Sequence, residues 1–239
     1  AYRRRLHLPR LLLDLGMTIG QIIGIMAGVG LVLGGLSATG VALSLASDLV
    51  GLVGDNVLLL LVAGAVTCFL LGMGLTVSAA YVLLAIVLVP GLLSLGVDLF
   101  AAHLFVIYWA SASYLTPPVA LAAFAASGIS GARPWDTAVE ATRLASVKYL
   151  LPFAFVLNPA LVAQAGSGQV FLAVILAVVG VPALALALGT SRPWWERLFL
   201  GAGGLLLLLP PGWFTGVGVA LLGVVILRHR VRRASTLAA

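Results

Sequence analysis

The chain has 239 residues, of which 62% are hydrophobic and only 8% are charged, and its mean hydropathy is +1.21. So little charge over this length excludes a soluble domain and indicates an integral membrane protein. The formal net charge of +6 comes from basic residues at the two ends and in short loops. This layout is typical of topology-setting flanks and argues against nucleic-acid binding.

The first part of the chain contains a basic flank, a span and a hairpin. Residues 1–16 are rich in arginine and predict a flank outside the bilayer, and residues 17–165 form the main membrane unit. This unit opens with a glycine-rich span at about residues 17–46. Residues 57–93 then form two apolar arms around a glycine-rich break, and each arm is shorter than the roughly 20 residues that a span needs. We therefore predict a re-entrant hairpin at residues 57–93.

The rest of this unit contains a broken helix, a charged helix and a further span. Residues 99–130 are apolar but are interrupted by consecutive prolines, which predicts a broken helix. Residues 131–148 combine mixed charge with apolar residues at helical spacing and predict an interfacial amphipathic helix. Residues 149–162 form the next span, in which Asn158 is polar enough to require a partner on another helix.

The last part of the chain is a transmembrane tail at residues 166–227, followed by a basic tail at residues 228–239. The sequence Pro210-Pro211-Gly212 divides the second half of the transmembrane tail into two short helices. If the hairpin enters and leaves the membrane on the outer side, every basic cluster falls in the cytoplasm, as the positive-inside rule requires. If the hairpin were a single span, the internal basic loops would lie outside, so the hairpin interpretation is preferred.

The first break joins the two arms of the hairpin. Its glycines let the backbone turn and expose carbonyl groups, while the hydroxyls of Thr76 and Ser78 add neutral oxygens that suit a hard cation such as Na⁺. The alternative interpretation is that these glycines only let membrane helices approach closely. The candidate ion-binding residues of this break are Gly72, Met73, Gly74, Thr76 and Ser78.

The second break interrupts residues 99–130. Its two prolines remove two backbone donors and free the carbonyls of the preceding turn. A new helix is expected to begin near Val119, and its positive N-terminal end is a natural seat for a carboxylate. The alternative is a simple proline kink. The candidate ion- and substrate-binding residues are Ser111, Ser113, Thr116, Pro117 and Pro118.

Two irregular segments so close together at membrane depth are typical of a secondary transporter, because only protein or a water-filled cavity can receive their backbone groups. No enzyme is indicated: the three histidines are far apart, no acidic residue lies in mid-span, and no ATP-binding loop is present. We interpret His103 as a packing or interfacial residue, and Asp98 as a helix cap or a water-facing group. Trp109 and Tyr108 flank the second break and are interpreted as aromatic core packing.

Four segments of the chain resemble the fused large permease subunit of the TRAP transporters, the tripartite ATP-independent periplasmic transporters. The resemblance covers roughly residues 17–162, with the segments in order and plausibly spaced. The segments are Gly72-Met-Gly-Leu-Thr-Val-Ser-Ala-Ala-Tyr-Val-Leu83, Ala102-His-Leu-Phe-Val-Ile-Tyr108, Leu115-Thr-Pro-Pro-Val-Ala-Leu-Ala-Ala123 and Pro152-Phe-Ala-Phe-Val-Leu-Asn-Pro-Ala-Leu161. After Gly-Met-Gly-Leu the family usually has Pro-Thr, where this chain has Thr76-Val77, so the hydroxyl is displaced by one position.

This resemblance implies an all-α, elevator-type permease of the bacterial inner membrane that imports organic acids with Na⁺ as the coupling ion and no other cofactor. Such permeases contain two inverted repeats, and this chain resembles the C-terminal repeat alone. Because the chain opens with Ala1, we expect it to derive from something longer. The implied partners are a periplasmic substrate-binding protein, the N-terminal repeat or small membrane subunit, and the lipid bilayer. Two alternatives stay open: a structural subunit that only assembles a complex, and another secondary transporter with broken helices.

Overall fold

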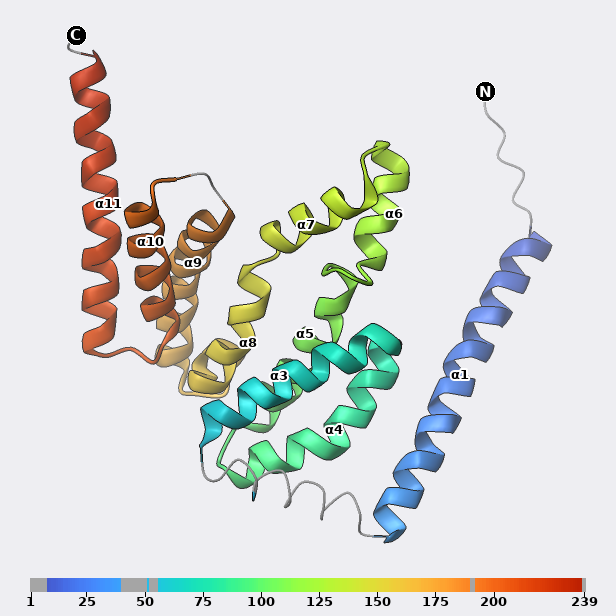
Figure 1. The fold of residues 1–239 in the computed structure, drawn as a ribbon. Helices are drawn as coiled ribbons and strands as arrows, with labels where there is room; N and C mark the ends of the chain where they lie inside the picture. Colours follow the sequence, from blue (N-terminus) through green and yellow to red (C-terminus); the bar gives the residue numbers. More distant parts are fainter. Residues whose placement is uncertain (1–7, 40–50, 52–55, 190–191, 238–239) are drawn as a thin grey trace.

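The computed structural model describes residues 8–39, 51, 56–189 and 192–237. Within these residues the regular structure is entirely helical, which confirms the predicted all-α fold (Figure 1). The helices are α1 (Leu8–Thr39), α3 (Val57–Gly74), α4 (Val77–Ser94), α5 (Leu99–Ala110), η1 (Ser111–Tyr114), α6 (Leu121–Ser130), α7 (Pro134–Leu144), α8 (Val147–Leu157), η2 (Pro159–Val162), α9 (Ser167–Gly189), α10 (Trp194–Leu208) and α11 (Trp213–Leu237).

Helices α3 and α4 form a hairpin at the predicted position, with only Leu75 and Thr76 between them. Figure 1 shows the start of α3 and the end of α4 side by side at the lower end of the molecule. The inner faces of both helices pack on α5, where Leu61, Leu92 and Phe105 are fully buried in one core. Because α4 returns to the end of the molecule at which α3 begins, the two helices have the geometry that a re-entrant hairpin requires.

The broken helix consists of α5, η1, an irregular segment and α6. Asp98 caps α5, because its carboxylate accepts hydrogen bonds from the backbone N–H groups of Phe100 (2.8 Å) and Ala101 (3.1 Å). This finding confirms the capping role predicted for Asp98. The new helix begins at Leu121, two residues later than predicted, because Ala120 takes a left-handed conformation with φ of 41°. The irregular segment is therefore longer than the sequence suggested.

The charged helix is shorter than the predicted range of residues 131–148. It starts at Pro134, because Gly131 has φ of 70° and ends α6, and it stops at Leu144. Lys148 already belongs to α8. At the far end of α8, the side chain of Asn158 donates a hydrogen bond to the carbonyl of Leu208 (3.0 Å). This bond to α10 is the interhelical partner predicted for Asn158.

The tail helices α9, α10 and α11 pack through closely approaching backbones. A Cβ atom added at Gly204 would lie 2.7 Å from the carbonyl oxygen of Gly180, and one added at Gly218 would lie 3.1 Å from that of Gly203. Helices α10 and α11 are separate, as the Pro-Pro-Gly sequence predicted. Helix α11, however, continues to Leu237 through much of the predicted basic tail, since arginine is a good helix former.

At the other end of the chain, α1 begins at Leu8, inside the predicted flank. It is described as far as Thr39, and the end of the predicted span at about residue 46 lies outside the described residues. Among the described helices, α4 and α9 are long and apolar enough to cross a membrane by length and composition. Helices α3, α5 and α6 are apolar but shorter, as expected for a hairpin arm and a broken helix.

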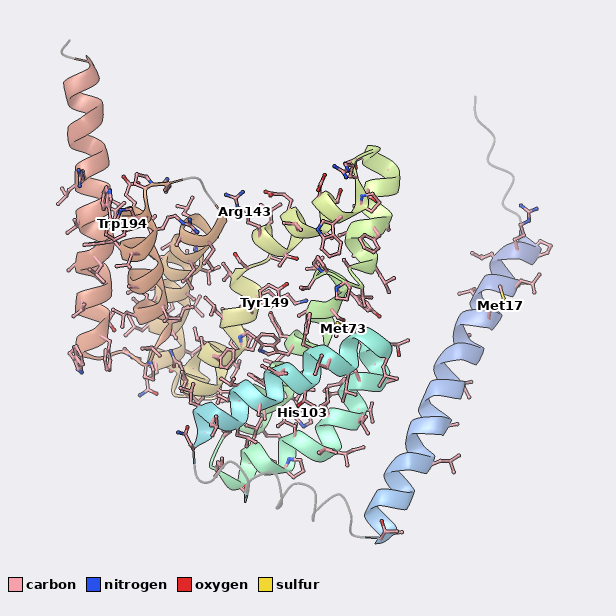
Figure 2. The ribbon with its side chains drawn as sticks, viewed as in Figure 1. Met17, Met73, His103, Arg143, Tyr149 and Trp194 are labelled. Atoms are coloured by element: carbon pink, nitrogen blue, oxygen red, sulfur yellow. The ribbon has the colours of Figure 1, made fainter. Side chains whose placement is uncertain are left out.

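The two ends of the molecule differ in the connections that they carry. In Figure 1 the α6–α7 turn and the end of α11 lie at the upper end, while the α8–α9 connection lies at the lower end with the base of the hairpin. Arg143 and Trp194 lie toward the upper end in Figure 2. The basic segment around α7 and the arginine-rich end of α11 therefore share one side, the arrangement that the positive-inside rule favours.

Candidate functional site

The turn of the hairpin is in direct contact with the break in the second helix. The Oγ atom of Ser113, which is fully buried, donates a hydrogen bond of 2.7 Å to the carbonyl oxygen of Gly72. A Cβ atom at Gly72 would lie only 2.3 Å from the carbonyl oxygen of Ala110. Glycine is therefore required here for close approach. The two segments lie far closer than the diameter of a helix, as a shared site requires.

A second contact ties the other arm of the hairpin to the same break. The backbone N–H of Val77 donates a hydrogen bond to the hydroxyl of Tyr114 (3.4 Å). Val77 is the first residue of α4, and the N–H groups in the first turn of a helix lack partners within it. Tyr114 was not predicted as a site residue. Its position between two predicted residues, Ser113 and Thr116, is the only signal that the sequence offered.

The hydroxyls predicted in the hairpin turn lie at its exposed side. The Oγ1 atom of Thr76 accepts a hydrogen bond from the N–H of Ala79 (3.3 Å) and caps α4. Thr76 and Ser78 are exposed, while Met73 is half-buried. Of the residues predicted in the hairpin turn, Gly72 contacts the second break directly. The role of the predicted residues as ion ligands, including that of Gly74, stays a prediction.

The hydroxyls of the second break have different partners. Ser111, which directly follows α5, donates to the carbonyl of Tyr108 in the last turn of that helix (3.0 Å). Thr116 donates to the carbonyl of Ala112 (2.8 Å) and also shares a hydrogen bond with the hydroxyl of Tyr149 on α8. Figure 2 shows Tyr149 deeper in the molecule than Arg143. Thr116 therefore connects the break to α8, whereas Ser113 connects it to the hairpin.

The backbone polar groups around the two prolines form hydrogen bonds with neighbouring protein groups. The carbonyl oxygen of Leu115 accepts a hydrogen bond from the hydroxyl of Thr142 on α7 (3.1 Å). The backbone N–H of Ala120 donates to the carbonyls of Ser113 and Thr116 (both 3.1 Å). Pro117 is half-buried and Pro118 is exposed. The break is thus a closed, hydrogen-bonded loop between α7, α8 and the hairpin, which is more than a kink in a continuous helix.

Aromatic rings line the side of the break that faces α8. The ring of Trp109 contacts those of Tyr149 and Phe153, with centroids 5.7 and 6.0 Å apart. The ring of Tyr108 contacts that of Phe155 edge-on at 5.3 Å. These contacts support the interpretation of Trp109 and Tyr108 as packing residues. Tyr149 was not predicted, because no pattern in the sequence connects it to residues more than 30 positions earlier.

His103 lies below the hairpin turn and joins α4 to α5 (Figure 2). Its Nδ1 atom lies 3.0 Å from the hydroxyl of Tyr81, and both side chains are part-buried. This arrangement fits the packing role predicted for His103. Asp98, the acidic residue nearest in the sequence, is occupied as a helix cap.

The contact between the two breaks brings together neutral oxygen atoms that could act as ligands. Carbonyl oxygens of Gly72 and Ala110 meet the hydroxyl of Ser113, which lies 3.1 Å from the second of them. Within the described part of the chain, no group of three or more His, Cys, Asp or Glu side chains could hold a metal ion. Such an oxygen set suits a hard monovalent cation, whereas a transition metal prefers nitrogen or sulfur ligands.

Comparison with known proteins gives one match. A family profile described as "Tripartite ATP-independent periplasmic transporter, DctM component" matches residues 3–170. The match covers well over half of the chain, includes both breaks, and ends at the start of α9. No curated protein and no solved structure matches the chain.

Proposed function

Because the chain belongs to the DctM component family of tripartite ATP-independent periplasmic transporters, we propose that it is one repeat of a permease that imports organic acids together with Na⁺. In this proposal a periplasmic binding protein delivers the carboxylate to the membrane. An N-terminal repeat and a small membrane subunit complete the permease, which moves as an elevator in the bacterial inner membrane.

The observation that carries the proposal is the buried contact between Gly72 and Ser113. The proton of the Ser113 hydroxyl can turn toward the carbonyl of Ala110, which is 3.1 Å away. The lone pairs of Ser113 and the carbonyl of Gly72 are then free to face a cation. A Na⁺ ion held there would join the hairpin to the broken helix, so that ion occupancy would control the position of the hairpin.

The distribution of charge supports coupling to Na⁺ over coupling to protons. Between residues 57 and 129, Asp98 is the only Asp, Glu, Lys or Arg, and it caps α5. A proton relay requires titratable groups at depth, and His103 is the one such candidate in this stretch of sequence. Neutral oxygens are therefore the better candidates for the coupling site.

The start of α6 is the better candidate for the organic acid. Its first turn carries the positive end of the helix dipole, and the helix begins directly after the irregular segment. A carboxylate at Leu121 would still need a cation nearby, which the bound Na⁺ or the other repeat would supply. The substrate would then bind next to the ion site, and the binding of one would favour the binding of the other.

The test is uptake of radiolabelled carboxylates by the complete transporter, with its binding protein, in proteoliposomes. We expect uptake to follow an inward Na⁺ gradient. Ser113→Ala should raise the Na⁺ concentration for half-maximal uptake by up to about tenfold, the effect of losing one good polar contact. Ser127→Ala is the matched control, since its hydroxyl is also buried but bonds to the carbonyl of Phe124 within its own helix, α6 (2.6 Å). Equal effects of the two substitutions, or uptake without Na⁺, would refute the ion site.

A further inference from the structure

An apolar groove lies between α8 and α9, away from the two breaks. Its volume is about 490 Å³, it is open to the surface, and its lining side chains are all apolar. Leu151 and Phe155 form part of the wall on α8, while Val174, Val178 and Pro182 form part of the wall on α9. One wall thus belongs to the region that the family profile matches and the other to the tail beyond it.

A basic residue lies in the first turn of α8, the helix that forms one wall of this groove. Lys148 precedes Leu151 by three residues and Phe155 by seven, so the three side chains share one face of α8. Lys148 is the only lysine in the chain and is half-buried. None of the ion pairs among the described residues involves Lys148, and the nearby Glu140 is paired with Arg143 (3.7 Å). A partly buried ammonium group without an acidic partner favours an anion from outside the protein.

The groove follows α8 and α9, which the sequence predicts to cross the membrane. Lys148 lies in the first turn of α8, soon after α7, at the end of the molecule where Figure 2 shows Arg143. With the basic segments in the cytoplasm, the groove runs from this interface toward the interior of the bilayer. Its ligand must therefore combine an anionic head at the cytoplasmic surface with an apolar chain.

We propose that the α8–α9 groove and Lys148 bind an anionic phospholipid of the cytoplasmic leaflet. The phosphate lies at the Lys148 ammonium group, and one acyl chain fills the groove between Phe155 and Val178. The lipid bridges the family-matched repeat and the tail. Basic sites between membrane helices on the cytoplasmic side bind acidic head groups in this way. The inference rests on the proposed orientation in the membrane and does not depend on Na⁺ coupling or on the substrate.

The test is native mass spectrometry of the complete transporter, purified in detergent and titrated with phosphatidylglycerol or phosphatidylcholine. We expect phosphatidylglycerol to bind and to raise the thermal midpoint, and phosphatidylcholine to do so far less. Lys148→Gln should lower phosphatidylglycerol occupancy about fivefold, the effect of one lysine at an anionic lipid surface. Arg143→Gln is the matched control, because Arg143 is an exposed basic residue of the same region.

A second variant tests the groove without changing its charge. Val178→Trp fills the apolar space and should displace the acyl chain although Lys148 is intact. Equal binding of both lipids, or unchanged phosphatidylglycerol occupancy in Lys148→Gln, would overturn the proposal. So would stabilisation by inorganic phosphate alone, which would mean that only an anion binds. Loss of a partner subunit in Val178→Trp would show that the groove is a protein interface instead.

Discussion

The Oγ atom of Ser113 and the carbonyl oxygen of Gly72 lie 2.7 Å apart, although 41 positions of sequence separate the two residues. This contact joins the end of α3 to the short 3₁₀ turn η1. The carbonyl groups in the last turn of a helix have no partner within that helix, so each segment by itself would leave polar backbone groups exposed at membrane depth. Together they form one buried polar centre, around which the other contacts of the site are arranged.

The first prediction concerns close approach at this centre. Gly72→Ala should lower the stability of the hairpin by about 1–3 kcal/mol, the usual cost of overpacking, because the new methyl group would meet the backbone carbonyl of Ala110 at 2.3 Å. Gly128→Ala is the control, since nothing lies within 4 Å of that position. Thermal unfolding of the purified transporter measures the stability of both variants. Equal stability of the two variants would show that the hairpin turn does not need this contact.

The second prediction concerns the hydrogen bond between Thr116 and Tyr149. In a double-mutant cycle, Thr116→Val and Tyr149→Phe should be non-additive by about 0.5–1.5 kcal/mol in stability, because each alone already breaks the bond. Thr137 provides a control, since its hydroxyl bonds to the carbonyl of Arg133 on the exposed face of α7. Thr137→Val combined with Tyr149→Phe should be additive. Additivity in the first pair would mean that the break is not held by α8.

The third prediction separates packing from proton transfer at His103. Glutamine can keep a hydrogen bond with the hydroxyl of Tyr81 but cannot carry a proton, so His103→Gln should retain most of the Na⁺-driven uptake. Uptake in proteoliposomes, measured under Na⁺ and proton gradients, checks this result. Uptake that a proton gradient drives without Na⁺, and that His103→Gln abolishes, would identify a proton-coupled transporter instead.

The fourth prediction is the orientation in the membrane. In a Cys68→Ala background, Gln164→Cys should react with an impermeant maleimide from the periplasm. Arg143→Cys should react only after the membrane is opened, because Arg143 precedes the start of α8 and Gln164 follows its end. Both side chains are exposed and so accessible to the reagent. Periplasmic labelling at Arg143→Cys would show that the predicted orientation of the hairpin is wrong, and it would remove the basis of the proposed ion site.

The positions of the two breaks could be predicted from the sequence because glycine and proline act on their own backbone. Consecutive prolines end a helix in any tertiary context, and glycines permit a tight approach wherever it occurs. The predicted hairpin of residues 57–93 accordingly differs from the observed end of α4, Ser94, by one residue. Local chemistry of this kind also explains the cap formed by Asp98.

The partners of the site could not be predicted in the same way. Tyr114 and Tyr149 owe their roles to which helices meet, and tertiary contacts of this kind leave no periodic pattern in the sequence. Thr76 shows the opposite case, in which a local interaction competes with the expected distant one. Its hydroxyl caps α4, a common role for threonine at the start of a helix.

The glycines of the tail have a consequence for how this protein can diverge. At Gly180 and Gly204 an added Cβ atom would lie within 3 Å of a carbonyl oxygen on the neighbouring helix, and at Gly203 one would lie 3.1 Å from the carbonyl oxygen of Gly218 on α11. Only hydrogen fits there, whereas exposed apolar positions of the same helices, such as Val219, can exchange with other apolar residues without loss of packing. Homologous tails should therefore drift nearly everywhere except at a few invariant glycines. The spacing of these glycines would then be the surest mark of common descent beyond residue 170, where the family profile ends.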